Sequence, residues 1–145
     1  MVTMTRQEIF ELLTTGTRTA HVASTRADGR PHVAPVWFTI VGTPDSFVIQ
    51  FTTGASSVKG RTLRRDNRVA LTVDDPRPPF AFVIVEGTVE CLEDRDRIME
   101  VATRLGEKYM GRDRAVEFGT RNAVTGELLA TVLPVRLIGE KNLTD

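Results

Sequence analysis

The pattern of apolar and polar positions along the chain predicts a mainly β protein with a few helices. Six runs are rich in the β-branched and aromatic residues that favour strands. They cover residues 19–25, 31–41, 46–53, 68–74, 80–92 and 127–138. The dipeptide Asp28-Gly29 between the first two runs favours a tight turn, so these runs form a β-hairpin. The third run extends the hairpin into a three-stranded antiparallel meander.

The longest run has a different pattern in its first half. The segment from Phe80 to Val85 reads Phe-Ala-Phe-Val-Ile-Val, without a clean alternation of apolar and polar residues. Such a segment is typical of a strand that is buried on both faces. We expect it to be a barrel wall that is also a subunit contact.

Three other stretches have a helical pattern. Thr5 and Glu8 have the spacing of a capping box before a short helix that ends near Gly16. A second helix follows the third strand over residues 57–67, and a long one covers residues 93–110 before the last strand. Residues 112–125 are polar, with a short helix around 115–118. The pattern therefore predicts one domain that covers residues 1–145. We expect it to be a small antiparallel β-barrel with peripheral helices.

Composition narrows the possible partners. The 19 lysine and arginine residues balance 19 aspartate and glutamate residues, so no global charge favours nucleic acid or an acidic membrane. No apolar run approaches the roughly 20 residues that span a bilayer. The single cysteine, Cys91, forms no internal disulfide and fits a reducing compartment. We expect a soluble cytoplasmic protein.

The strongest functional signal is the segment Phe51 to Leu63, where a strand ends and a helix begins. Hydroxyl groups close the strand, and Lys59 and Arg61 lie in the first turns of the helix. A helix N-terminus has free N–H groups and a partial positive charge. Together these groups predict a site for a phosphate or a similar anion. The arginines further along, Arg64 and Arg65, are typical of a solvated helix face.

Other kinds of site have little support in the sequence. His21, His32 and Cys91 have no spacing typical of a catalytic dyad, and a structural role is favoured for His21. No paired His or Cys spacing indicates a metal site. Trp37 alternates with Phe38 in its strand, so a buried Phe38 leaves Trp37 on the outer face. An aromatic ring there needs a cover, which a subunit or a flat cofactor ring would supply.

Taken together, these features resemble the pyridoxamine 5'-phosphate oxidase-like split-barrel family of flavin- and deazaflavin-binding proteins. The similarity extends through nearly the whole chain. Each matching segment alone is a weak signal, and the segments together are more specific. It is carried by residues 19–25, 31–38, 57–66, 69–73 and 85–89. Within the family, the chain is most similar to short proteins that use coenzyme F420, an 8-hydroxy-5-deazaflavin with a phosphate and an oligoglutamate tail.

The resemblance implies a homodimer with two cofactor sites at the interface, each built from both chains. The resemblance also implies that two aromatic residues, Phe80 and Phe82, lie near the cofactor. Two positions depart from the usual pattern: Ser57 replaces a second basic residue, and Thr62 replaces a common asparagine. The implied cofactor-binding residues are His32, Pro35, Val36 and Trp37 at the ring and side chain, Thr52 and Thr53 beside them, Ser57, Lys59, Arg61 and Thr62 at the phosphate, and Phe80.

The resemblance implies hydride transfer from reduced F420 to an electron-poor double bond or carbonyl of a small molecule. The sequence identifies no general acid. FMN remains an alternative cofactor, because an anion site and an aromatic wall suit either ring. A non-catalytic carrier or sensor that binds flavin, deazaflavin or haem is a further alternative. In such a protein His32 would be a ligand of the bound group rather than a wall residue.

Overall fold

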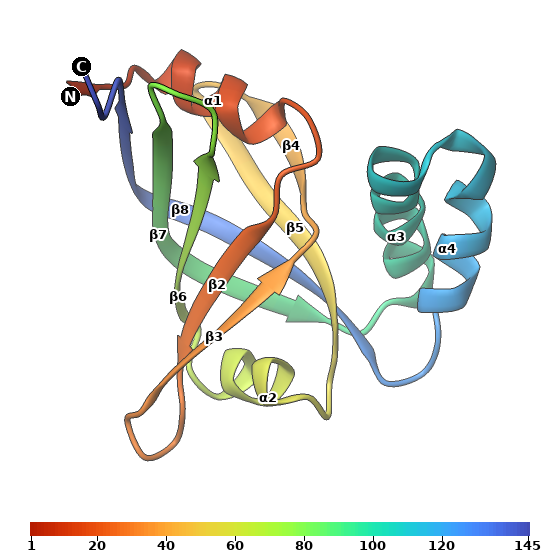
Figure 1. The fold of residues 1–145 in the computed structure, drawn as a ribbon. Helices are drawn as coiled ribbons and strands as arrows, with labels where there is room; N and C mark the ends of the chain where they lie inside the picture. The colour runs from red at the N-terminus through yellow and green to blue at the C-terminus, as the bar shows by residue number, and fades with distance from the viewer.

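The computed structural model describes residues 1–145 and contains eight strands and four α-helices (Figure 1). The strands are β1 (Val2–Thr3), β2 (Ala20–Thr25), β3 (Pro31–Val36), β4 (Thr39–Thr43), β5 (Ser46–Gly54), β6 (Arg68–Asp75), β7 (Ala81–Leu92) and β8 (Glu127–Lys141). The helices are α1 (Arg6–Thr14), α2 (Val58–Arg65), α3 (Arg95–Met110) and α4 (Ala115–Asn122), with a 3₁₀ turn at Arg112–Arg114.

The strands form one antiparallel sheet that curls around the core. Their order is β3-β2-β6-β7-β8-β5-β4, and the short β1 pairs with the end of β8. The pairing of β7 with β8 continues along all of β7, with a register shift between Glu86 and Gly87. The mainly antiparallel split-barrel prediction is confirmed, including the helix inserted after the third long strand run and the long helix before the last strand.

The predicted meander needs one correction. The run 31–41 forms two strands, because β3 pairs only with β2 and β4 pairs only with β5. Trp37 and Phe38 separate them. Phe38 is fully buried, and its backbone N–H donates to the Tyr109 hydroxyl at 3.3 Å rather than to a neighbouring strand. Both hairpins therefore exist, but the strand between them is broken where Phe38 enters the core.

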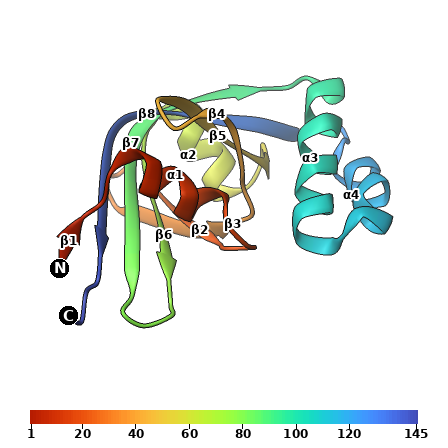
Figure 2. The same cartoon turned by 90° about the horizontal axis from the view of Figure 1, so that it is seen from above.

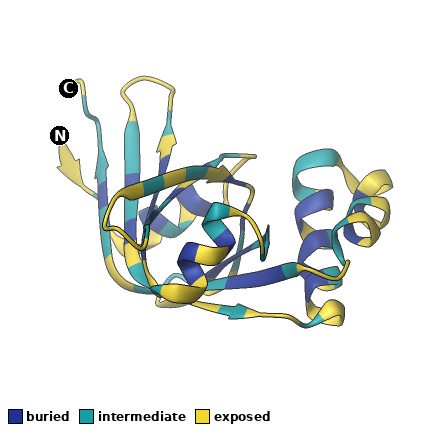
Figure 3. Cartoon of the chain, turned by 90° about the horizontal axis from the view of Figure 1, so that it is seen from below, coloured by how far each residue is buried: buried dark blue, intermediate teal, exposed yellow.

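Helices α1 and α2 cover opposite ends of the barrel (Figure 1). The predicted capping box is present at α1: the Thr5 hydroxyl accepts from the Glu8 N–H, and the Glu8 carboxylate accepts from the Thr5 N–H. The apolar side of α1 enters the main core. On α2, Thr62 and Leu63 are buried and Arg61 is exposed, which gives the helix two contrasting faces (Figure 3).

The pair α3 and α4 packs at one side of the barrel (Figures 1 and 2). The apolar side of α3 forms a smaller core with Leu129 of β8. Helix α3 ends at Gly111 as predicted, with a φ of 97°. Helix α4 is longer than the predicted short helix at 115–118, because Phe118 and Ala123 also pack on α3. None of the helices combines the length and apolar character needed to cross a bilayer.

The longest predicted strand run begins one residue later than expected, and its expected subunit contact stays a prediction. In β7, Val83 and Val85 are buried while Phe82 and Ile84 are partly exposed, so one face of this segment is open in the single chain. Phe80 lies outside the strand, in the β6–β7 turn with a φ of 66°. The C-terminal tail is tied to its own chain, because the Leu143 N–H donates to the Pro79 carbonyl at 2.8 Å.

Candidate functional site

The predicted anion segment forms a compact turn between β5 and α2. Ser57 is the N-cap of α2, and its hydroxyl oxygen accepts from the Gly60 N–H at 2.9 Å. The same hydroxyl donates to the Gly54 carbonyl at 2.8 Å, and the Thr53 hydroxyl lies 3.4 Å away. The serine thus fixes the start of the helix directly over the end of the strand.

Gly60 allows this close approach. A Cβ atom at this position would lie 2.0 Å from the Gly54 carbonyl oxygen and 3.1 Å from the Ala55 Cα. Only a residue without a side chain fits there. The Gly60 backbone therefore brings the first turn of α2, and Lys59 with it, against the strand end.

A hollow of about 540 Å³ opens beside this turn. Five elements contribute to it: β3, the end of β5, the start of α2, the end of α4 and the beginning of β8. Five predicted residues meet there, namely His32, Thr52, Thr53, Ser57 and Lys59. Residues outside the predicted set complete its lining: Ala34, Gly54, Val58, Asn122 and Glu127.

Lys59 and Glu127 supply opposite charges to the hollow. Burial lowers the pKa of Lys59 from its ordinary value, while the charge of Glu127 raises it. Burial likewise raises the pKa of Glu127, and the charge of Lys59 lowers it. Neither side chain makes a hydrogen bond or an ion pair within the chain. A bound anion would restore to Lys59 the electrostatic support that burial removes.

His32 adds an unsatisfied polar group. Its Nδ1 atom is buried and has no hydrogen-bond partner. Buried polar atoms are normally paired, so an atom of this kind marks a place where a ligand or another chain completes the bonding. With the hydroxyl groups and Lys59, it makes the hollow chemically suited to a polar, anionic part of a cofactor.

Some predicted residues lie outside the hollow for a simple geometric reason. Alternate residues of β3 point to opposite faces, so Pro35 lies on the other side of the strand from His32. Val36 shares the side of His32 but is buried in the core. Arg61 lies on the exposed side of α2. Phe80 lies in the β6–β7 turn, which is at the opposite end of the barrel from α2 (Figure 1).

Thr62 is also outside the hollow. It is buried, its hydroxyl lies 2.8 Å from that of Ser24, and it donates to the Lys59 carbonyl at 2.9 Å. In the single chain this side chain ties α2 to β2. Its predicted contact with phosphate remains a prediction.

Trp37 has a cover that the sequence did not indicate. Its ring stacks on Tyr109 of α3 with centroids 4.6 Å apart and 2° between the planes, and it contacts Phe118 at 5.5 Å. Lys108 donates to the Phe38 carbonyl at 2.8 Å, and burial lowers its pKa to about 8. One face of Trp37 is thus covered by its own chain, although 39% of the residue remains exposed.

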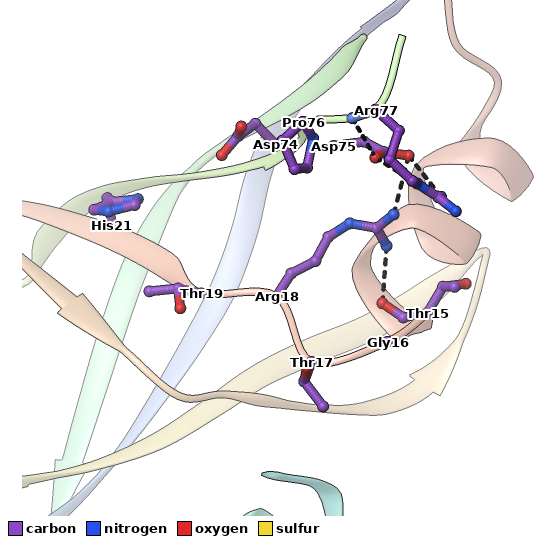
Figure 4. A pocket seen from close by; sticks show the side chains of 10 residues that line it. All are labelled: Thr15, Gly16, Thr17, Arg18, Thr19, His21, Asp74, Asp75, Pro76 and Arg77. Atoms are coloured by element: carbon purple, nitrogen blue, oxygen red, sulfur yellow. Dashed lines mark hydrogen bonds and ion pairs between the residues drawn. The ribbon is translucent and has the colours of Figure 1, made fainter.

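A second pocket, of about 430 Å³, lies between the α1–β2 connection and the end of β6 (Figure 4). Both of its arginines are already paired with Asp75. Asp75 lies 3.1 Å from the Arg18 guanidinium and 2.8 Å from that of Arg77. Arg18 also donates to the Leu12 and Thr15 carbonyls. His21 points away from this cluster.

The paired Asp75 gives a stability prediction. Hydrogen bonds from Arg77 hold the pKa of Asp75 well below its ordinary value, so its contribution is present above about pH 4 and is lost as the pH falls through the folded-state pKa. We expect Asp75→Asn to destabilise the protein at pH 7 by on the order of 1 kcal/mol, allowing for solvent screening. The melting temperature should fall by roughly 3 °C.

Melting curves from pH 2 to 7 check this expectation. The difference between Asp75→Asn and the parent protein should shrink as the medium becomes strongly acidic. Asp74→Asn is the matched control, because the exposed Asp74 makes no ion pair. A constant difference across the pH range would contradict the assigned role of Asp75.

Comparison with solved structures shows several relatives of this fold. A conserved hypothetical protein from Mycobacterium tuberculosis has a TM-score of 0.81 at 24% identity, covering 98% of this chain and 89% of that one. An F420 reductase has a TM-score of 0.66 at 26% identity, covering 88% and 94%. A FAD-binding protein from Mesorhizobium loti has a TM-score of 0.66 at 20% identity, covering 95% of each chain.

Comparison with known sequences identifies the family to which the chain belongs. No curated protein matches this sequence. The family model described as pyridoxamine 5'-phosphate oxidase matches residues 5–134, which include strands β2 to β7, the first half of β8 and the whole α2 turn. The chain therefore belongs to the pyridoxamine 5'-phosphate oxidase family.

Proposed function

We propose that the protein is an oxidoreductase that uses reduced coenzyme F420 to transfer a hydride to an electron-poor double bond or carbonyl of a small molecule. The observation that carries this proposal is the hollow beside α2. There Ser57, Lys59 and the orphaned His32 nitrogen meet at the end of β5. The F420 reductase among the structural relatives supports the choice of a deazaflavin.

The residues of the hollow would hold the cofactor rather than react. Lys59 and the hydroxyls of Thr53 and Ser57 would bind the phosphate, and His32 would bond a polar group of the side chain. The bound deazaflavin supplies hydride chemistry at its C5 carbon. The protein contributes position, electrostatics and exclusion of water. No side chain is assigned as the proton donor.

The proposal includes a homodimer. Phe80 and the hollow lie at opposite ends of the barrel, so one cofactor cannot contact both within a single chain (Figure 1). A partner chain would bring Phe80 to the site. The partly exposed Phe82 and Ile84 on β7 are consistent with a covered face there.

FMN is the second candidate cofactor, and an FMN-dependent oxidase or reductase is the corresponding function. The FAD-binding relative supports it, because that protein has the same fold and its name indicates a flavin. The two candidates differ in chemistry, since reduced deazaflavin reacts poorly with oxygen whereas reduced FMN permits oxidase activity.

Fluorescence-quenching titrations with F420 and FMN separate these candidates. We expect F420 to bind at least roughly tenfold more tightly than FMN, a difference of about 1.4 kcal/mol. The absorbance of the purified protein should likewise match a deazaflavin. If FMN binds as tightly as F420 or more tightly, the assignment of F420 is wrong.

A further inference from the structure

Glu127 is a charged residue of the hollow that no predicted role explains. It is the first residue of β8 and pairs in register with Gly54 of β5. Its Oε1 atom would lie only 3.8 Å from a Cβ at Gly54, so the carboxylate extends across the strand end that leads into the Ser57 turn. It lines the hollow with Lys59 and has no hydrogen bond or ion pair within the chain.

The net charge of the residues that line the hollow is therefore close to zero. Lys59 on α2 provides one positive charge, Glu127 on β8 one negative charge, and His32 on β3 is the remaining titratable group. The other lining residues are uncharged. A site built to hold a doubly charged anion normally concentrates cations, and a carboxylate at its edge opposes the second negative charge.

Phosphate groups differ in this respect. A phosphate monoester carries about −1.5 to −2 charges at pH 7, because its second pKa is near 6. A phosphodiester has lost that ionisable oxygen and carries a single negative charge. FMN ends in a phosphate monoester, whereas the phosphate of F420 links the ribityl chain to the tail as a diester.

On the proposed function, we infer that Glu127 is a specificity residue that makes the hollow prefer a phosphodiester over a phosphate monoester. Lys59 attracts either anion. Glu127 repels the monoester phosphate more, because that group itself carries the additional charge, whereas the carboxylates of the F420 tail are attached beyond its phosphate. The polyol hydroxyls that accompany both phosphates would donate hydrogen bonds to the unpaired carboxylate.

The burial of the hollow strengthens this discrimination. Burial already makes the charged form of Glu127 costly, which is why its pKa is raised. If the phosphate binds about 7 Å from the Glu127 carboxylate, one additional charge at an effective dielectric constant between 20 and 80 changes the affinity by roughly threefold to fiftyfold. Glu127→Gln removes the repulsion while keeping the shape of the side chain.

The test measures dissociation constants of F420, FMN and riboflavin by fluorescence quenching for the parent protein and Glu127→Gln. Each ligand is compared between the two proteins, so differences between the rings cancel. Riboflavin lacks phosphate and reports the effect on the ring and polyol alone. Glu11→Gln is the matched control: it makes the same charge change on α1, at the opposite end of the barrel, where the Glu11 carboxylate accepts only from the Gln7 side chain.

We expect Glu127→Gln to tighten FMN binding by at least roughly threefold more than it tightens F420 binding. Riboflavin should not gain affinity, and Glu11→Gln should change none of the three. Equal changes for FMN and F420, or no change for FMN, would overturn the role of Glu127 while leaving the proposed function intact. Failure of all three ligands to bind either protein would overturn both.

Discussion

Replacing Gly60 by alanine is expected to destabilise the protein and to disrupt cofactor binding. The new Cβ would lie 2.0 Å from the Gly54 carbonyl oxygen. Neither atom can rotate away, because the Cβ is attached directly to the helix backbone and the oxygen belongs to the strand backbone. Alanine has the higher helix propensity, by about 1 kcal/mol. Overpacking against fixed backbone costs about 1–3 kcal/mol and sometimes more, so at this contact distance the clash outweighs the propensity.

The free energy of unfolding of Gly60→Ala should therefore fall by roughly 2 kcal/mol, measured by urea denaturation. Because α2 must move away from β5, Lys59 moves with it, and F420 affinity should also decrease. Gly54→Ala is the control in the same turn, since its Cβ would meet only Glu127 Oε1 at an ordinary 3.8 Å. If Gly60→Ala were as stable as Gly54→Ala, the close approach of α2 to β5 would be wrong.

Replacing Lys59 by alanine is expected to weaken F420 binding by on the order of 1.5 to 3 kcal/mol, the range of a charge-assisted hydrogen bond. Lys59 is the cationic side chain of the hollow and has no other partner. Its removal also leaves Glu127 as an uncompensated negative charge beside the phosphate. The fold should be little affected, because the ammonium makes no hydrogen bond within the chain.

Fluorescence titration of Lys59→Ala with F420 measures this effect. Arg64→Ala is the matched control, because Arg64 lies on the exposed side of the same helix and outside the hollow. We expect the control to bind F420 nearly as well as the parent protein. Unchanged affinity in Lys59→Ala would remove Lys59 from the site.

Local features of the fold were predictable from the sequence. The capping box of Thr5 and Glu8, the turn at Gly29 and the end of α3 at Gly111 each depend on residues close together in the chain. The turn around Ser57 is of the same kind. In each case the residue type itself satisfies the backbone geometry or the hydrogen bond that the element requires.

Features that depend on distant segments were not predictable. The break between β3 and β4 occurs because Phe38 enters the core and meets the Tyr109 hydroxyl from α3. Glu127 meets Lys59 only because β8 pairs with β5. The cover of Trp37 by Tyr109 likewise requires the placement of α3, which no periodicity within either segment encodes.

The hollow beside α2 was predictable in part, and the reason is again the strand pairing. The residues at one strand end and the following helix start, including Thr53, Ser57 and Lys59, meet as the sequence indicates. Phe80 lies in the β6–β7 turn, which is at the opposite end of the barrel from α2 (Figure 1). Under the proposed function a second chain would have to bring Phe80 to the hollow, and the sequence of one chain does not place that second chain.

A crystal structure of the protein with bound F420 would locate the cofactor phosphate. We expect the phosphate to lie in the hollow between β5, α2 and β8, within hydrogen-bond distance of the Ser57 hydroxyl and the Lys59 ammonium. A phosphate bound elsewhere, such as beside Arg18 and Arg77 in the pocket of Figure 4, would contradict it.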